Sequence, residues 1–227
     1  MSMDARPEKT QSNAQRAARA IRELIFSGDL SPGSDHLETE LAMRLGMSRT
    51  PIREAVVMLE GQGLLSVRPR KGVRILPVSP DDMREIYDVL TALESLAAEN
   101  AAKAGHRDTD LAELADAIER MDLAIGREDR SAWALADDDF HRELVRLGGN
   151  SRIEEIVERM SNQVRRARWV TLYVRPLPTK SNEDHREVYE AIRAGDAERA
   201  RRQHQLHRQH ARDVLVELLS GLGLNRV

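Results

Sequence analysis

The sequence contains no cysteine among its 227 residues, and this absence excludes several kinds of site. Disulfide frameworks, thiol catalysis, cysteine-ligated zinc and iron–sulfur clusters all need thiols, so any metal site must use histidine and carboxylate ligands. Long apolar runs are missing too. No stretch approaches the ~18 consecutive apolar residues of a membrane span, and the first residues lack the apolar segment of a secretory signal. We therefore expect a cytoplasmic protein with no membrane partner.

Charge is distributed unevenly along the chain, although the formal net charge is only −3. Residues 1–78 carry a net charge of +3, and the remainder carries −6. Within the basic part, residues 44–74 hold seven Lys or Arg against two Glu. Such a stretch indicates a polyanionic partner, and a solvated basic surface without a partner is the alternative.

Three helices and a hairpin are predicted in the first third of the chain. Apolar residues at helical spacing predict helices at about 14–26, 38–45 and 49–60. Ser48 can cap the third helix, whose apolar stripe turns Arg49 and Arg53 outward. Residues 64–76 look like two short strands around a basic turn. Together these elements predict a winged helix-turn-helix, a module that places its third helix in the DNA major groove.

Proline residues at positions 77 and 80 form a break, beyond which the pattern is almost wholly helical. The expected helices lie at about 80–104, 108–125, 130–147, 150–173, 181–194 and 196–219. The fold class is therefore mostly α: a winged helix-turn-helix of three helices and a small β-hairpin wing, then an all-α antiparallel bundle of about six helices. The predicted domains are a flexible tail at 1–12, the winged helix at 13–78 and the bundle at 79–227.

Several segments follow a known pattern. These are ELIFSGDLSPG at 23–33, ELA at 40–42 and LGMSRTPIREA at 45–55, and they resemble the winged-helix signature of GntR-type transcription regulators. The markers in the second half are Asp137-x-x-Phe140-His141, Asn150, His185, AIRAGD at 191–196 and His207. These markers resemble the FCD ligand-binding domain of the FadR-like branch of that family. The resemblance implies a DNA-binding domain joined to a helical domain for effector binding and dimerisation.

DNA recognition needs side chains that reach base edges and charges that neutralise phosphates. Arg49 and Arg53 lie four residues apart on one helix face, and an Arg fork can donate two hydrogen bonds to guanine, worth ~1–3 kcal/mol of discrimination. Short donors near the helix N-terminus can bind phosphate, and the remaining cations would add sequence-independent affinity. The predicted DNA-binding residues are Arg44, Ser48, Arg49, Thr50, Arg53, Arg68, Arg70 and Lys71.

The resemblance also carries the family's metal ligands onto Asp137, His141, His185 and His207. Asp137 and His141 are four residues apart, so they project from one helix face toward the same point, although such a pair is also common without a metal. One carboxylate and three imidazoles suit one divalent ion per chain, zinc or nickel, and suit manganese less well. The competing candidates are His204 and His210 for an imidazole, and Asp138 and Asp139 for the carboxylate.

An effector site is expected in the same helical domain, and the resemblance favours a carboxylate as effector. Many members of the family hold the effector carboxylate with an arginine at the position of Leu90, so either the effector of this chain is not a carboxylate or the cation that holds it comes from elsewhere in the chain. Arg165 or Arg168 could replace it, and the spacing does not choose between them. Trp169 could line the cavity beside them, as could Trp133 and Tyr173, although aromatic residues in a bundle are more often core.

Three functions remain open on this basis. The first is an effector-responsive transcription regulator that binds a pseudo-palindromic double-stranded operator as a homodimer, with a metal and a small organic acid modulating DNA affinity. The alternative is a metal-dependent hydrolase with an appended nucleic-acid-binding module, which turnover screening with divalent metals would detect. The third is architectural DNA binding without an effector. We expect the first function, and no enzymatic activity.

Overall fold

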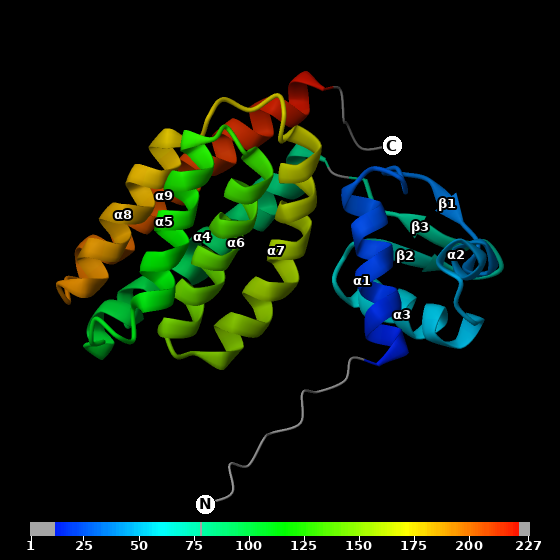
Figure 1. The fold of residues 1–227 in the computed structure, drawn as a ribbon, viewed down its shortest axis with the longest axis horizontal. Helices are drawn as coiled ribbons and strands as arrows, with labels where there is room; N and C mark the ends of the chain where they lie inside the picture. Colours follow the sequence, from blue (N-terminus) through cyan, green and yellow to red (C-terminus); the bar gives the residue numbers. More distant parts are fainter. Residues whose placement is uncertain (1–11, 78, 223–227) are drawn as a thin grey trace, which may run out of the picture. The chain divides into compact units, whose positions relative to one another are not determined.

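The computed structural model describes residues 12–77 and 79–222. The chain divides into two compact units, with the division between Leu76 and Pro77 (Figure 1). The predicted tail at 1–12 lies outside the described residues except for Ser12, which caps the first helix. Within the described ranges, no helix is both long enough and apolar enough to cross a membrane.

Three helices build the core of the first unit: α1 (Asn13–Phe26), α2 (Glu38–Leu45) and α3 (Arg49–Gly61). Ser12 and Gln15 form a reciprocal capping box at the start of α1. The apolar stripes of the helices face one another, and Ile21, Ile52 and Leu59 are fully buried in one cluster. Because that stripe of α3 is buried, the opposite side of the helix faces solvent.

A small antiparallel sheet completes the first unit. Its strands are β1 (Asp35–His36), β2 (Leu65–Arg68) and β3 (Gly72–Ile75), in the order β1-β3-β2. The β2–β3 pair is the predicted wing. β1 adds a third strand, which periodicity cannot reveal because the strand has only two residues. Gly72 has a φ of +83°, and a Cβ there would lie 2.2 Å from the carbonyl oxygen of His36. The close approach of β1 to β3 therefore requires glycine at this position.

The helices of the second unit pack into a bundle (Figure 1). They are α4 (Pro80–Ala104), α5 (Ala112–Gly126), α6 (Arg130–Leu147), α7 (Ser151–Thr171), α8 (Thr179–Arg193) and α9 (Ala197–Gly221). The predicted start of α5 at 108 is four residues early. Arg107 and Asp110 close a turn there through their backbone and side chains, so the helix begins after it.

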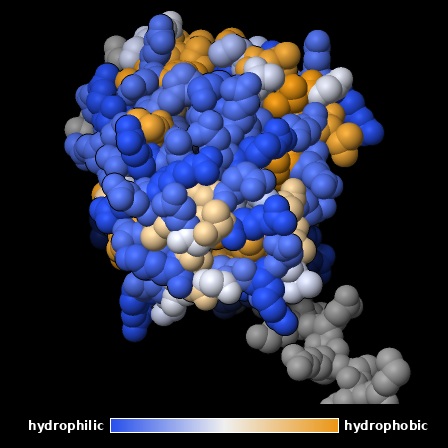
Figure 2. Space-filling view, turned by 90° about the vertical axis from the view of Figure 1, so that its left-hand side faces the viewer, coloured by the Kyte–Doolittle hydropathy of each residue, from blue (hydrophilic) through white to orange (hydrophobic). Residues whose placement is uncertain are grey.

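Two apolar clusters form the core of this bundle. One contains Trp133, Phe140 and Leu144, and the other contains Tyr87 and Leu90. Trp133 is therefore a core residue, and Leu90 is fully buried. Tyr173 is 78% exposed, so it does not line the interior. The face drawn in Figure 2 is covered mostly by hydrophilic side chains, and its hydrophobic residues lie in separate patches.

Candidate nucleic-acid interface and metal centre

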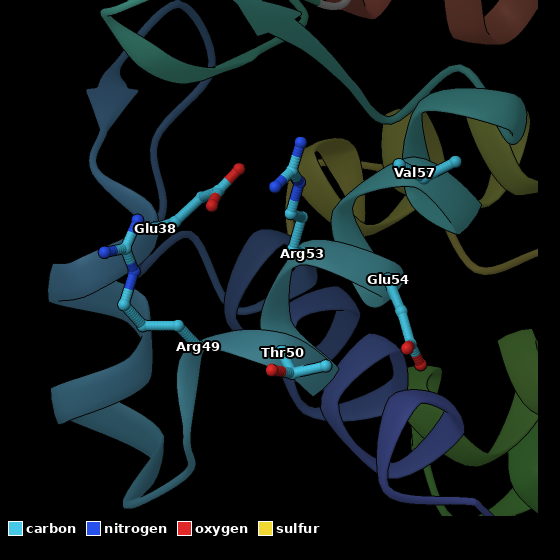
Figure 3. Close-up of a pocket in the computed structure, with 6 residues that line it drawn as sticks. All are labelled: Glu38, Arg49, Thr50, Arg53, Glu54 and Val57. Carbon is cyan, nitrogen blue, oxygen red and sulfur yellow. The ribbon is translucent and has the colours of Figure 1, made fainter.

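The exposed side of α3 forms an open pocket with the start of α2 (Figure 3). Arg49, Arg53 and Val57 succeed one another every four residues, so they form a stripe along α3 opposite its buried face. Both arginines are exposed, and Val57 is 61% exposed. The residues that line the pocket are Glu38, Arg49, Thr50, Arg53, Glu54 and Val57. This stripe offers donors and one apolar contact to an approaching surface.

Glu38, Glu54 and Val57 were not predicted as part of this surface. The spacing of Val57 from Arg53 was available in the sequence, because it is the same interval that joins the two arginines. Glu38 could not be found that way, since it lies on another helix. In Figure 3 its carboxylate points into the same pocket as Arg53. A carboxylate there can accept a hydrogen bond from a cytosine amino group, so the pocket is equipped with both donors and an acceptor.

The remaining predicted DNA-binding residues surround this stripe, and some have acidic neighbours. Ser48 occupies the N-cap position of α3, but its side chain makes no capping hydrogen bond, contrary to prediction. Arg44 pairs with Asp29 at 3.3 Å, and Arg68 pairs with Asp35 at 3.7 Å. Exposed pairs of this kind are worth only about 0–1 kcal/mol, so both guanidinium groups remain available to phosphates.

The wing carries its cations at the tip. Arg70 lies in the turn between β2 and β3 with a φ of 64°, in the left-handed region, and Lys71 follows it. Both side chains are exposed. Two adjacent positive charges at an exposed turn can contact a polyanion without rearrangement of the sheet.

Three predicted metal ligands converge inside the second unit. His141 on α6, His185 on α8 and His207 on α9 are all buried. The Nε2 atom of His141 lies 3.4 Å from that of His185 and 3.3 Å from that of His207. Three nitrogens around a zinc ion with Zn–N bonds of about 2.0–2.1 Å would be about 3.4 Å apart in a tetrahedral arrangement. The spacing therefore fits a divalent ion held by these imidazoles.

Asp137 lies beside these nitrogens, one turn before His141. Its Oδ1 is 3.5 Å from Nε2 of His185, while its Oδ2 accepts a hydrogen bond from Arg168. Burial alone would raise the pKa of Asp137, but the neighbouring guanidinium of Arg168 opposes this, and the pKa lies below its ordinary value, so the carboxylate stays ionised. One oxygen can thus face an ion while the other is held by Arg168.

The imidazoles are neutral at pH 7, which is the state that binds metal. Burial lowers the pKa of His141 to about 4 and that of His207 to about 4, and it holds the pKa of His185 well below the ordinary value. Neutral imidazoles need not lose a proton before they bind an ion.

The competing ligand candidates occupy different places. His210 is exposed. Asp138 bonds to Arg165 at 2.5 Å and to Arg168 at 2.6 Å, and Asp139 pairs with Arg120 and Arg142.

His204, the other competing imidazole, is buried. Its Nε2 lies 3.3 Å from the Oε2 of Glu94, a fully buried carboxylate that the sequence did not suggest. Glu94, His141 and His204 form a second group whose ligand atoms lie close enough to hold an ion.

The predicted effector residues cluster around Asp137 and Asp138. Arg168 donates to both carboxylates, Arg165 donates to that of Asp138 only, and Trp169 is half-buried against the Phe140 cluster. Two buried N–H groups on α6 and α7 lack a hydrogen-bond partner among the described residues: Nε1 of Trp133 and Nε of Arg168. Trp133 precedes Asp137 by one turn on the same face of α6. Orphaned donors of this kind indicate where an acceptor can bind.

Comparisons with known proteins cover both units. Residues 13–75 match the model for bacterial regulatory proteins of the gntR family, and residues 85–210 match the FCD domain. A helix-turn-helix-type transcriptional regulator in the TAR-I ttuE-ttuC' intergenic region of Agrobacterium vitis is 44% identical over 131 residues, which cover 57% of this chain and 77% of that protein.

A second relative and one solved structure extend the match. A helix-turn-helix-type transcriptional regulator in an unstable DNA locus of Streptomyces ambofaciens is 31% identical over 183 residues, covering 80% of this chain and 75% of its own length. The structure of E. coli McbR/YncC has a TM-score of 0.78 at 23% identity and covers 92% of this chain and 99% of its own, a likeness of fold.

Proposed function

Because the chain belongs to the GntR family of bacterial regulatory proteins and carries an FCD domain, we propose that it is a metal-containing, effector-responsive regulator that binds its operator as a homodimer in the cytoplasm. That it is a DNA-binding transcription regulator, and not an enzyme, follows from the family and from relatives that are themselves transcriptional regulators. The hydrolase alternative is therefore wrong.

We infer that α3 reads the operator. The stripe formed by Arg49, Arg53 and Val57 supports this, because two Arg forks can each bind a guanine and an exposed valine can contact a thymine methyl group. Glu38 would accept from a cytosine amino group beside them. Ser48 and Thr50 at the helix start would bind phosphate. Arg44, Arg68, Arg70 and Lys71 would neutralise further phosphates around this contact.

The observation that carries the effector proposal is the convergence of three buried imidazoles, in which Nε2 of His141 lies 3.4 Å from that of His185 and 3.3 Å from that of His207. Nitrogen donors in this number suit zinc or nickel. Asp137 would be the fourth ligand of a tetrahedral ion, and an expansion of the coordination shell beyond four ligands would add a position that a carboxylate effector could occupy. When bound, the ion would supply a positive charge that attracts such an effector.

The protein groups proposed to receive the effector lie on α6 and α7. Nε of Arg168 and Nε1 of Trp133 are buried donors without partners in the described part of the chain, and either can bond to a carboxylate oxygen. Arg168 takes the place of the arginine that the family often has where this chain has Leu90. Arg165 supports it through their shared partner Asp138, and Trp169, the next residue after Arg168, is half-buried against the cluster that contains Phe140.

Effector binding would act on DNA through its differential affinity for two arrangements of the dimer. A single winged helix buries too little surface on DNA for tight specific binding. We therefore expect two copies to bind a pseudo-palindromic operator as a dimer. An effector that favours one separation of the two recognition helices changes operator affinity without touching DNA.

The test separates effector response from DNA binding. His185→Ala and His207→Ala are expected to lose most bound zinc or nickel and still bind operator, but to release it no longer when a panel of mono-, di- and tricarboxylic acids is added. Trp133→Phe should weaken release by the active acid while retaining the ion, and Tyr173→Phe, at an exposed residue outside the proposed site, serves as its control. Unaltered acid-dependent release in the histidine variants would show that the ion takes no part, and a lack of any response in the wild-type protein would favour the architectural alternative.

A further inference from the structure

A fully buried carboxylate, Glu94, lies behind the proposed metal centre. Its Oε1 is 3.0 Å from Nη2 of Arg208, and its Oε2 is 3.0 Å from Nδ1 of His141 and 3.3 Å from Nε2 of His204. None of these residues is more than 6% exposed. One carboxylate from α4 thus faces α6 through His141 and α9 through the other two residues.

His141 presents its two ring nitrogens to two different surroundings. Nε2 faces the corresponding atoms of His185 and His207, while Nδ1 faces Glu94. A neutral imidazole carries one proton, so it can offer a lone pair at Nε2 only when that proton is on Nδ1. An anionic acceptor at Nδ1 selects this tautomer.

We propose that Glu94 is a positioning residue for the metal centre, which holds His141 in the Nδ1–H tautomer and aims its Nε2 at the ion. The proposal rests on the proposed function, because it takes His141 as a metal ligand. The distance of 3.0 Å between Oε2 of Glu94 and Nδ1 of His141 is within hydrogen-bond range, but the angles are not those of a hydrogen bond. Neither atom has another hydrogen-bond partner among the described residues. A ring turned to ligate an ion would complete this contact.

A second ion held by Glu94, His141 and His204 is the competing explanation, since their ligand atoms lie close together. Two observations oppose it. The guanidinium of Arg208 already stands 3.0 Å from the carboxylate and would repel a second cation. His141 would also need lone pairs at both nitrogens, which a neutral imidazole does not have.

The decisive substitution is Glu94→Gln. Arg208 can only donate, so it will keep the amide oxygen, and the NH₂ group will then face Nδ1 of His141 and favour the wrong tautomer. Zinc affinity, measured by competition with a chromophoric chelator, should fall about 10- to 100-fold. Two-bond ¹⁵N–¹H spectra of the zinc-free protein should show His141 protonated at Nδ1 in the wild type and at Nε2 in the variant.

The matched control is Glu99→Gln. Glu99 also joins α4 to α9, through Arg201 at 2.7 Å, but it does not contact a proposed ligand. Its substitution should change neither zinc affinity nor the tautomer of His141. If Glu94→Gln does not fold, Glu94→Asp, which keeps the charge but shortens the reach, should lower zinc affinity as well.

Several results would overturn the proposal. These are equal zinc affinities in the Glu94→Gln and Glu99→Gln variants, an unchanged His141 tautomer, or two zinc ions per chain of which His204→Gln removes one. Failure of the proposed function is a separate outcome. If the wild type binds no zinc, the metal proposal falls, and the spectra of the zinc-free protein alone decide whether Glu94 sets the tautomer.

Discussion

Different side chains of α3 stabilise the fold and are proposed to contact DNA. The buried stripe holds the helix in the first unit, whereas Arg49 and Arg53 are exposed and contribute nothing to that core. Substitutions at these two positions should therefore affect DNA binding and leave stability almost unchanged.

Arg49→Ala and Arg53→Ala should each lower affinity for the selected operator and abolish the preference for it, because each removes a fork that can discriminate by ~1–3 kcal/mol. Binding titrations against operator and random DNA, together with thermal unfolding, would check this. Wild-type specificity in both variants would refute the assignment of α3 as the reading helix.

The buried histidines give the ion-free protein a predictable response to pH. Burial lowers the pKa of His141 and His207 to about 4, while in the unfolded chain both return to about 6.5. The unfolded state therefore binds more protons between these values, so the free energy of unfolding should fall as the pH is lowered from about 6.5 to about 4.

Urea unfolding with a chelator present, at a series of pH values, measures this slope. His207→Gln should reduce it, because one titrating group is removed, and Gln205→Ala, an exposed position on the same helix, should not, because it removes no titrating group. A slope unaffected by His207→Gln would mean that this histidine is not kept neutral by burial.

For helices and strands, the periodicity of apolar residues predicted the bounds of an element well where the element is long. The helices were predicted close to their observed bounds, since each buries one stripe over several turns. β1 has two residues and no period, and its pairing with β3 depends on a distant segment. The start of α5 was misplaced because the turn at Arg107–Asp110 depends on side-chain bonding rather than hydrophobic pattern.

The residues of the proposed metal centre could also be predicted only in part. Asp137 and His141 share a helix, so their proximity follows from spacing, and the family resemblance supplied His185 and His207. Glu94 and Arg208 bond across 114 positions of sequence, and neither belongs to a motif. Their contact depends on how α4 packs against α9, which the pattern of either helix alone does not specify.

The packing of α4 against α6 depends on a glycine. A Cβ at Gly148 would lie 2.8 Å from the carbonyl oxygen of Ala97, and backbone cannot yield as a flexible side chain does. Gly148→Ala should therefore lower the free energy of unfolding by about 1–3 kcal/mol. Gly126→Ala, where no atom lies within 4 Å, should be neutral or slightly stabilising in the same urea titration. Equal stability of the two variants would contradict the close approach of these helices.

The wing offers a test of charge without sequence preference. Lys71→Ala should weaken binding to operator and random DNA alike and reduce the salt dependence of log K by about one unit, because one phosphate contact is lost. Lys103→Ala, which removes an exposed charge from α4, is the control. An identical salt slope in both variants would exclude the tip of the wing from the phosphate contacts.

For the whole molecule, the central question is assembly. On α4 and α7, an exposed apolar side chain is followed one turn later by a half-buried one: Val89 by Leu93 on α4, and Ile156 by Met160 on α7. Paired residues at this spacing are typical of a helix face that a second copy covers.

Light scattering at micromolar concentration should therefore give twice the mass of one chain. Val89→Asp and Ile156→Asp should shift the protein toward monomer and weaken operator binding. Leu123→Asp on α5 is the control, since it adds a charge at a residue that is 59% exposed without belonging to either pair. A monomeric wild type would refute the homodimer.

The order of the ligands along the chain has a consequence for biosynthesis. The first unit is complete once Leu76 has been translated, whereas the proposed ion needs His207 on the last helix. Domains generally fold in the order in which they leave the ribosome. A nascent chain would thus acquire its DNA-binding module long before it could hold an ion, and responsiveness would be the last property that it gains.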